Sequence, residues 1–144
     1  MLLLTKILLT ILTLGYSAIP AKFDSDNTHA TNPLWTGHAR FHVVWQVTSY
    51  CIIAAFVLAC IWLPILPGHT GLVLATVGAT AAYAGFFTAL LTMKLYGGAA
   101  FDTNGVQPIY PFGIELDLNV ALFLPLAVLT VVCIWLVYRV IAAG

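Results

Sequence analysis

The sequence predicts an all-α integral membrane protein, a single domain in which residues 1–144 form a bundle of four transmembrane helices. Composition is the first observation behind this prediction. Hydrophobic residues make up 62% of the chain and charged residues 7%, against ~45–50% and ~25% in soluble proteins. The second observation is that four stretches approach the ~20 apolar residues that a helix needs to cross a hydrocarbon core of ~30 Å. Four spans place both termini on one side of the membrane.

The predicted spans are residues 2–20, 41–66, 71–93 and 118–138. Lys6 lies near the start of the first span, where its long side chain extends to the interface. This span also resembles a secretory signal, but three leucines precede the lysine and Tyr16 and Ile19 are too large for the −3 position of a cleavage site. We therefore expect an uncleaved helix.

The connections between the predicted spans differ in length. Residues 67–70 form a tight Pro-Gly turn, so spans two and three are antiparallel neighbours. The loops at 21–36 and 95–116 are long, and both lie at the opposite end of the bundle. Because the second loop is half apolar, we expect it to fold back over this end of the bundle as a lid or a short re-entrant segment.

Charge and cysteine content exclude several function classes. Five Lys and Arg balance five Asp and Glu, so no basic field is present to hold nucleic acid. Cys51, Cys60 and Cys133 lie in apolar runs without a C-x-x-C pair. This pattern argues against a disulfide scaffold, a zinc ribbon and a thiol oxidoreductase.

The ionisable residues divide unevenly between the two ends of the predicted bundle. The end with the termini holds Lys6, His69 and Arg139. The other end, the predicted mouth, holds Lys22, Asp24, Asp26, His29, His38, Arg40, His42, Lys94, Asp102, Glu115 and Asp117. All five acids and three of the four histidines are in this second group. This distribution predicts either a functional site at the mouth or a solvent-exposed polar surface there.

A polar stripe enters the second span. At ~100° per residue, His38, His42, Trp45, Gln46 and Ser49 share about a third of the helix circumference, and Arg40 points the opposite way. Polar groups at this depth face protein or trapped water, because contact with lipid is costly. The stripe predicts a polar cavity, or a hydrogen-bonded helix-entry cluster that binds nothing. The predicted ligand-binding residues are Trp45, Gln46, Ser49, Tyr50, Tyr83 and Asn119.

Two chemistries suit the histidines. The H-x-x-x-H pair of His38 and His42 is a bidentate metal pattern, which His29 or an acid would complete into a three-ligand zinc or copper site. Proton transfer is the chemistry that we favour, with no cofactor, since a histidine beside a carboxylate forms an acid/base pair. We expect His38, His42, Asp24 and Glu115 to form one catalytic cluster in which His42 handles the proton. Four histidines are too few for a membrane di-iron oxygenase.

Three segments carry a resemblance to a known family. They are Ser17-Ala-Ile-Pro20 followed by Asp24, Pro33-Leu-Trp35, and Leu122-Phe-Leu-Pro125. They resemble the EXPERA-type four-helix family of the emopamil-binding sterol isomerase and the sigma-2 receptor. The resemblance implies an apolar ligand cavity and, for the isomerase, a histidine and an acid one helical turn apart that shift a sterol double bond. Here His38 and His42 have that spacing, so a histidine stands in the acid's place.

The segment from Asn32 to His42 also resembles small bacterial membrane proteins. The sequence therefore predicts a protein of the bacterial inner membrane with cytoplasmic termini, which binds or converts a lipophilic small molecule by isomerase-like proton transfer. The alternative is a non-catalytic accessory subunit of a larger membrane complex. Expected partners are membrane lipid, the lipophilic molecule, and either a second copy of the chain or a larger complex. Ion transport is disfavoured, because no buried acid continues a relay past Ser49.

Overall fold

The computed structural model describes residues 1–101 and 103–144, and this part of the chain forms an all-helical bundle without strands. The long helices are α1 (Leu2–Phe23), α2 (Gly37–Trp62), α3 (Thr70–Thr92) and α4 (Leu118–Ala142), and two short 3₁₀ helices are η1 (Met93–Leu95) and η2 (Pro111–Gly113). Each long helix is long and apolar enough to cross a membrane. The predicted fold class, a bundle of four transmembrane helices, is confirmed.

Local capping explains where the observed helices depart from the predicted spans. Helix α2 begins at Gly37 rather than at 41, because the Thr36 hydroxyl accepts a hydrogen bond from the backbone N–H of Ala39 at 3.2 Å. It ends at Trp62 because Pro64 disfavours helical continuation. Helix α4 begins where the sequence predicted, directly after Asp117, whose carboxylate accepts a hydrogen bond from the N–H of Val120 at 3.1 Å.

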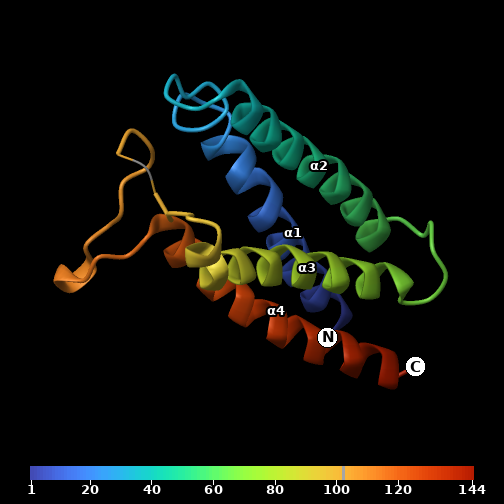
Figure 1. Cartoon of the computed structure of the whole chain (residues 1–144). Coiled ribbons are helices and arrows are strands. Elements are labelled where there is room, and N and C mark those ends of the chain that lie inside the picture. The colour runs from blue at the N-terminus through green and yellow to red at the C-terminus, as the bar shows by residue number, and fades with distance from the viewer. Residues whose placement is uncertain (102) are drawn as a thin grey trace.

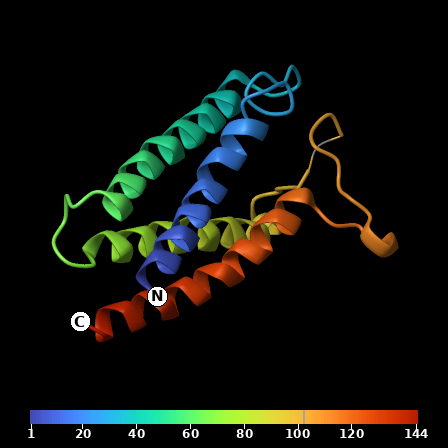
Figure 2. The ribbon, with the colours of Figure 1, turned by 180° about the vertical axis from the view of Figure 1, so that it is seen from behind.

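Both termini lie at one end of the bundle, together with the short α2–α3 connection (Figures 1 and 2). We call this the terminal end. Gly68 has a φ of +55° in the connection, a conformation that glycine adopts without strain. The long loops, at 24–36 and at 96–101 with 103–117, lie at the opposite end, which we call the mouth end. Among the residues that the structure describes, the bundle thus separates the two groups of ionisable residues as the sequence predicted.

The helices pack unequally along their length. Helices α1 and α3 each approach all three of the other long helices, whereas within the described residues the backbones of α2 and α4 do not come close to each other. In Figure 1 the pair α1 and α2 diverges from the pair α3 and α4 toward the mouth end. The tight part of the bundle is therefore near the terminal end.

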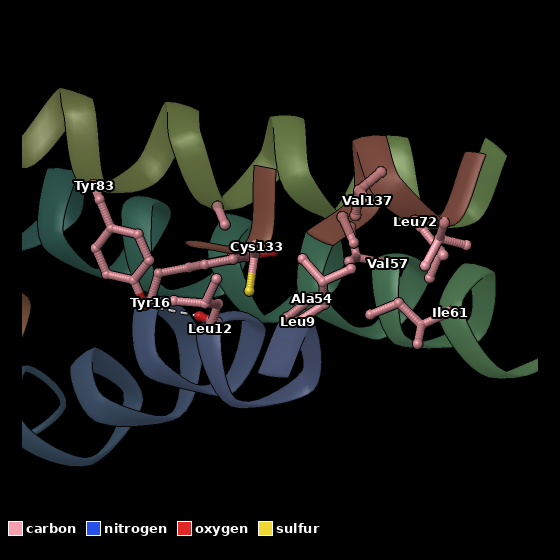
Figure 3. Close-up of a cluster of buried hydrophobic side chains, with 13 residues drawn as sticks. Leu9, Leu12, Tyr16, Ala54, Val57, Ile61, Leu72, Tyr83, Cys133 and Val137 are labelled. Carbon is pink, nitrogen blue, oxygen red and sulfur yellow. Dashed lines mark hydrogen bonds between the residues drawn. The ribbon is translucent and has the colours of Figure 1, made fainter. Parts of the chain in front are cut away.

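The core connects all four helices, with Leu9, Leu12 and Tyr16 from α1 at its centre (Figure 3). The Tyr83 hydroxyl crosses from α3 to α1 and donates a hydrogen bond to the Leu12 carbonyl at 2.8 Å. Helices α2 and α3 approach closely at Gly71, where a Cβ atom would overlap the carbonyl oxygen of Cys60. Close backbone approach at a small residue is a common way for helices to associate in lipid.

Asn32 joins the two long loops at the mouth end. Its side chain is fully buried and donates to the Thr28 carbonyl at 2.9 Å, while its Oδ1 accepts from the Leu34 N–H at 3.0 Å. The same Oδ1 accepts from the Asn104 side chain of the second loop at 2.6 Å. One buried amide therefore organises the first loop and holds part of the second against it.

We expect the substitution Asn32→Ala to loosen both loops. It removes three hydrogen bonds and leaves buried donors and acceptors unpaired, which costs about 1–3 kcal/mol for each such group. Limited proteolysis should cut residues 24–36 several-fold faster in the variant than in the wild type. Asn27→Ala, at an exposed position of the same loop, is the matched control and should leave the cleavage rate unchanged.

The predicted lid is not formed by the second half of the long loop. Ile109 and Leu116 exchange backbone hydrogen bonds of 2.9 and 2.8 Å and close a small hairpin. The hairpin tip at η2 projects away from the bundle, and Phe112 at this tip is fully exposed (Figures 1 and 2). The apolar character of the segment thus gives an exposed arm rather than a cover over the mouth.

Candidate functional site

A cavity of about 420 Å³ opens among the mouth-end halves of the four helices. Its volume lies within the range of ~300–1,000 Å³ typical of small-molecule sites. It is lined by Tyr16, Ile19, Pro20, Phe23, Asp24, His29, Gln46, Tyr50, Ala82, Tyr83, Gly85, Phe86, Ala89, Asn119 and Phe123. Most of these side chains are apolar or aromatic, and a few polar groups gather among them.

A chain of edge-to-face aromatic contacts forms much of the cavity wall. The ring of Tyr16 lies 5.9 Å from that of Tyr50 and 6.4 Å from that of Tyr83. Phe123 continues the chain, at 5.7 Å from Tyr83 and 4.8 Å from Phe86. These separations are those that aromatic pairs prefer. Each helix contributes at least one ring, so the wall is built only when the bundle assembles.

Besides its tyrosines, the ionisable groups of the cavity are Asp24 and His29. Asp24 ends α1, and five residues later the first loop brings His29 back, so that Asp24 Oδ1 lies 3.9 Å from His29 Nδ1. About a quarter of each side chain is exposed. The amides of Gln46 and Asn119 also line this cavity. A carboxylate, an imidazole and two amides therefore border one apolar space.

The two acids of the first loop have opposite electrostatic environments. Burial raises the pKa of Asp24, an effect that the nearby His29 partly offsets. Hydrogen bonds from the hydroxyl and the backbone N–H of Thr28 lower the pKa of Asp26, which is fully exposed. Asp24 is thus the acid whose charge is poorly solvated, and Asp26 is a loop-forming residue.

Hydrogen bonds and an edge-to-face aromatic contact orient the His29 ring. The Thr28 Oγ1 atom lies 2.8 Å from His29 Nδ1 and 2.7 Å from Asp26 Oδ1. If the hydroxyl donates to the Asp26 carboxylate, Nδ1 carries the imidazole proton and Nε2 is left as an acceptor. The ring of Trp35 packs against His29 edge to face at 5.3 Å. A base held by neighbouring groups is the arrangement that proton transfer requires.

His38 and His42 lie outside the cavity lining, and their ring nitrogens face each other with an Nε2–Nε2 distance of 3.1 Å. Both are exposed, and Trp45, next to His42, is 59% exposed. The physical reason is the rotation of α2. Its bundle-facing side is centred on Ala54 and Val57. One edge of the predicted stripe therefore faces the cavity, and the other edge faces away from the bundle.

The remaining ligand-binding residues predicted on α2 divide in the same way. Gln46 from the stripe and Tyr50, one helical turn further along α2, line the cavity. Ser49, half-buried, is not part of the lining. Tyr83 and Asn119, predicted from the other helices, do line it. The structure thus brings four of the six predicted ligand-binding residues together.

Glu115 is not near Asp24 but belongs to the projecting hairpin. Its carboxylate accepts a hydrogen bond from the Tyr110 hydroxyl at 3.1 Å, and both side chains are exposed. Helix α4 begins only at Leu118, so Glu115 precedes the helix. Asp102, also assigned to the mouth, lies outside the described residues. The predicted single cluster of His38, His42, Asp24 and Glu115 is therefore not formed.

The alternative metal site of His29, His38 and His42 is also not assembled. His29 lies beside Asp24, whereas the other two histidines contact each other on the outer face of α2. Across the described ranges, no group of three or more His, Cys, Asp or Glu side chains is placed to hold a metal ion.

Sequence analysis gave His29 only a metal-binding role and did not select Tyr16, Phe86 and Phe123. A signal for Phe86 was present, since it follows Tyr83 by three residues and shares its helix face. No family model, curated protein or solved structure matches the chain. The arrangement of the site supports two chemical abilities, namely enclosure of an apolar molecule and movement of a proton at its polar border.

Proposed function

We propose that the protein binds a small lipophilic molecule in the cavity among its four helices. The observation that carries this proposal is the cavity of about 420 Å³ with aromatic walls and a border of Asp24, His29, Gln46 and Asn119. An apolar body packs against the rings, while the amides orient a hydroxyl or carbonyl group. The resemblance to the EXPERA-type family favours a ligand with a rigid ring system.

At this site we infer an isomerase-like proton transfer, with His29 in place of His42 as the proton-handling residue. The imidazolium form of the ring donates a proton to one carbon of the ligand's double bond, and the resulting carbocation loses a proton from a neighbouring carbon to the now neutral imidazole, so the double bond moves without net change in composition. Asp24 beside the ring stabilises the imidazolium form. His29 is the histidine that borders the cavity, which is why the role is assigned to it.

Deuterium incorporation tests this assignment. The full-length protein in lipid nanodiscs is incubated in D₂O with a Δ8-sterol, and the deuterium content of the sterol is followed by mass spectrometry. His29→Gln keeps the size and hydrogen bonding of the side chain but does not titrate. We expect it to lower the incorporation rate by about 10²-fold or more, the contribution typical of a general acid or base.

His42→Gln is the matched control, because His42 is exposed on α2 and does not line the cavity. It should incorporate deuterium at the wild-type rate. Loss of incorporation in His42→Gln with retention in His29→Gln would return the proton-handling role to His42. If the wild-type protein exchanges no proton with the sterol but still binds it, the protein is a binder rather than an isomerase.

A second candidate function, an accessory subunit of a larger membrane complex, is favoured by the projecting hairpin. Tyr110, Phe112 and Ile114 expose apolar surface at its tip, and an exposed apolar patch is typical of an interaction site. Purification separates the candidates. Recovery as a monodisperse monomer or homodimer with lipid favours the ligand-binding function, whereas recovery only with larger partners favours the subunit.

For localisation, we propose the bacterial inner membrane with the termini in the cytoplasm. The terminal end carries only basic charges, Lys6 and Arg139, and this positive charge is the basis of the proposal, whereas the positive-inside rule counts basic residues and the mouth end has three, Lys22, Arg40 and Lys94. Single cysteines at positions 69 and 104, in a variant without the natural cysteines, should label from opposite sides, with 69 protected in intact cells. Labelling of both from the same side would contradict the topology.

A further inference from the structure

A second cavity, of about 350 Å³, lies at the terminal end of the bundle. It is bounded by the start of α1, the end of α2 and the connection into α3, which lie together in Figure 1. Lys6, Trp62 and His69 supply its polar groups, and Leu2, Leu63 and Leu66 supply apolar wall. It is at the opposite end of the helices from Asp24, so it is separate from the proposed ligand site.

The Lys6 ammonium is held at this cavity by the ring of Trp62. The Nζ atom lies 5.5 Å from the ring centroid, within the range of a cation–π interaction. The ring is itself fixed, because Trp62 Nε1 donates a hydrogen bond to the Thr10 hydroxyl at 2.9 Å. A half-buried cation is thus positioned at the cavity rather than free to extend into water.

Lys6 has no anionic partner in the part of the chain that the structure describes. The ion pair found there joins His29 to Asp24, and the four described acids all belong to the mouth end. Withdrawing a cation from water is costly unless an anion compensates it. The cavity therefore provides a basic group, and His69 as a further hydrogen-bonding side chain, and no described Asp or Glu side chain pairs with them.

The aromatic residues of the terminal end indicate the level of the lipid headgroups. Trp62 and Trp135 both lie there and are about half exposed, and Arg139 is positioned over the Trp135 ring at 5.3 Å. Tryptophan is enriched where the hydrocarbon meets the headgroups, and basic side chains extend to the same level. An anion at this level is most directly a lipid phosphate, whose acyl chains would follow the apolar wall.

We propose that the terminal-end cavity binds a phosphate group, contacted by Lys6 and His69, as part of a phospholipid headgroup. The proposal is independent of the function inferred for the mouth end. Lys6 supplies the charge, and Trp62 holds the lysine in place. The leucines of the cavity wall contact the part of an acyl chain nearest the headgroup. Free phosphate has the same charged chemistry, and the experiment below distinguishes the two sources.

Native mass spectrometry of the full-length protein in detergent tests the proposal with dioctanoyl phosphatidylglycerol as the probe. We expect one lipid to bind preferentially, and dioctanoylglycerol, which lacks the phosphate, to bind much more weakly. Lys6→Gln should weaken phosphatidylglycerol binding by about fivefold, the equivalent of the ~1 kcal/mol that one basic residue contributes at an anionic surface. Lys6→Arg, which retains the charge, should bind as the wild type does.

Lys22→Gln is the matched control, since Lys22 is an exposed lysine at the other end of the same helix. It should leave lipid binding unchanged. Equal losses in Lys6→Gln and Lys22→Gln, or equal binding of the lipid with and without phosphate, would overturn the proposal. Displacement of the lipid by inorganic phosphate would identify a site for phosphate groups in general, and its absence would restrict the site to lipids.

Discussion

Replacing Gly85 with phenylalanine is expected to abolish occupancy of the mouth-end cavity. Gly85 lines this cavity, and a Cβ atom added to it would meet no neighbouring atom within 4 Å. A large side chain therefore enters the space without displacing the backbone of another helix. Overlap with a bound molecule costs several kcal/mol, and each ~1.4 kcal/mol is a tenfold loss of affinity, so we expect a loss of about 10²-fold or more.

The measurement is photo-crosslinking of the protein in lipid nanodiscs with an aryl diazirine, followed by peptide mass spectrometry. In the wild type the probe should label Tyr50 in the cavity as well as lipid-facing residues such as Val131, which is exposed. In Gly85→Phe, labelling of Tyr50 should fall to background while labelling of Val131 persists. The lipid-facing residue thus reports that the bundle is still folded in the membrane.

Ala84→Phe is the matched control, because Ala84 is the adjacent residue on the exposed side of α3 and lines no part of this cavity. It adds the same side chain to the same helix turn and should leave Tyr50 labelling intact. Equal losses in both variants would mean that the effect comes from α3 as a whole, and that the cavity does not hold the probe.

Gly71→Ala is expected to destabilise the bundle by about 3 kcal/mol, at the upper end of the usual cost of overpacking. The added Cβ would overlap the backbone carbonyl of Cys60, which cannot turn aside as a side chain does. Helices α2 and α3 must then separate, and Leu72, which is buried beside this contact, loses packing. The free energy of unfolding, measured with denaturant in mixed micelles, checks this result.

The same helix offers the control for this substitution. Gly85→Ala also replaces a glycine in α3, but its new methyl group meets open space. Since alanine is the better helix former by about 0.8–1.0 kcal/mol in a helix interior, this variant should be as stable as the wild type or slightly more so. Equal destabilisation by both substitutions would contradict a specific close approach at Gly71.

The sequence by itself determined the membrane fold and the distribution of charge. Length and apolar content of each span are properties of a single segment, and the hydrocarbon core selects them without reference to neighbours. The spans at 2–20 and 71–93 therefore match α1 and α3 to within about one helical turn. An even number of spans then placed Lys6 and Arg139 at one end and Asp24 at the other.

The rotation of each helix about its axis was decided only by tertiary packing. The stripe from His38 to Ser49 is wide enough for several orientations of α2, and the packing of Ala54 and Val57 against α1 and α3 selected one of them. That orientation directs Gln46 to the cavity and leaves His42 outside. Composition cannot specify such a rotation when lipid accepts apolar side chains on any face of a helix.

The acid/base pair was likewise decided by tertiary structure, in this instance by the path of a loop. Asp24 and His29 were both visible as polar residues of the first loop, but no helical or strand period relates their side chains. They meet because the loop turns back after α1 and is held by the buried Asn32, which also contacts the second loop. Hydrogen bonds between loops far apart in the sequence leave no periodic signal, so this contact emerges only in the folded chain.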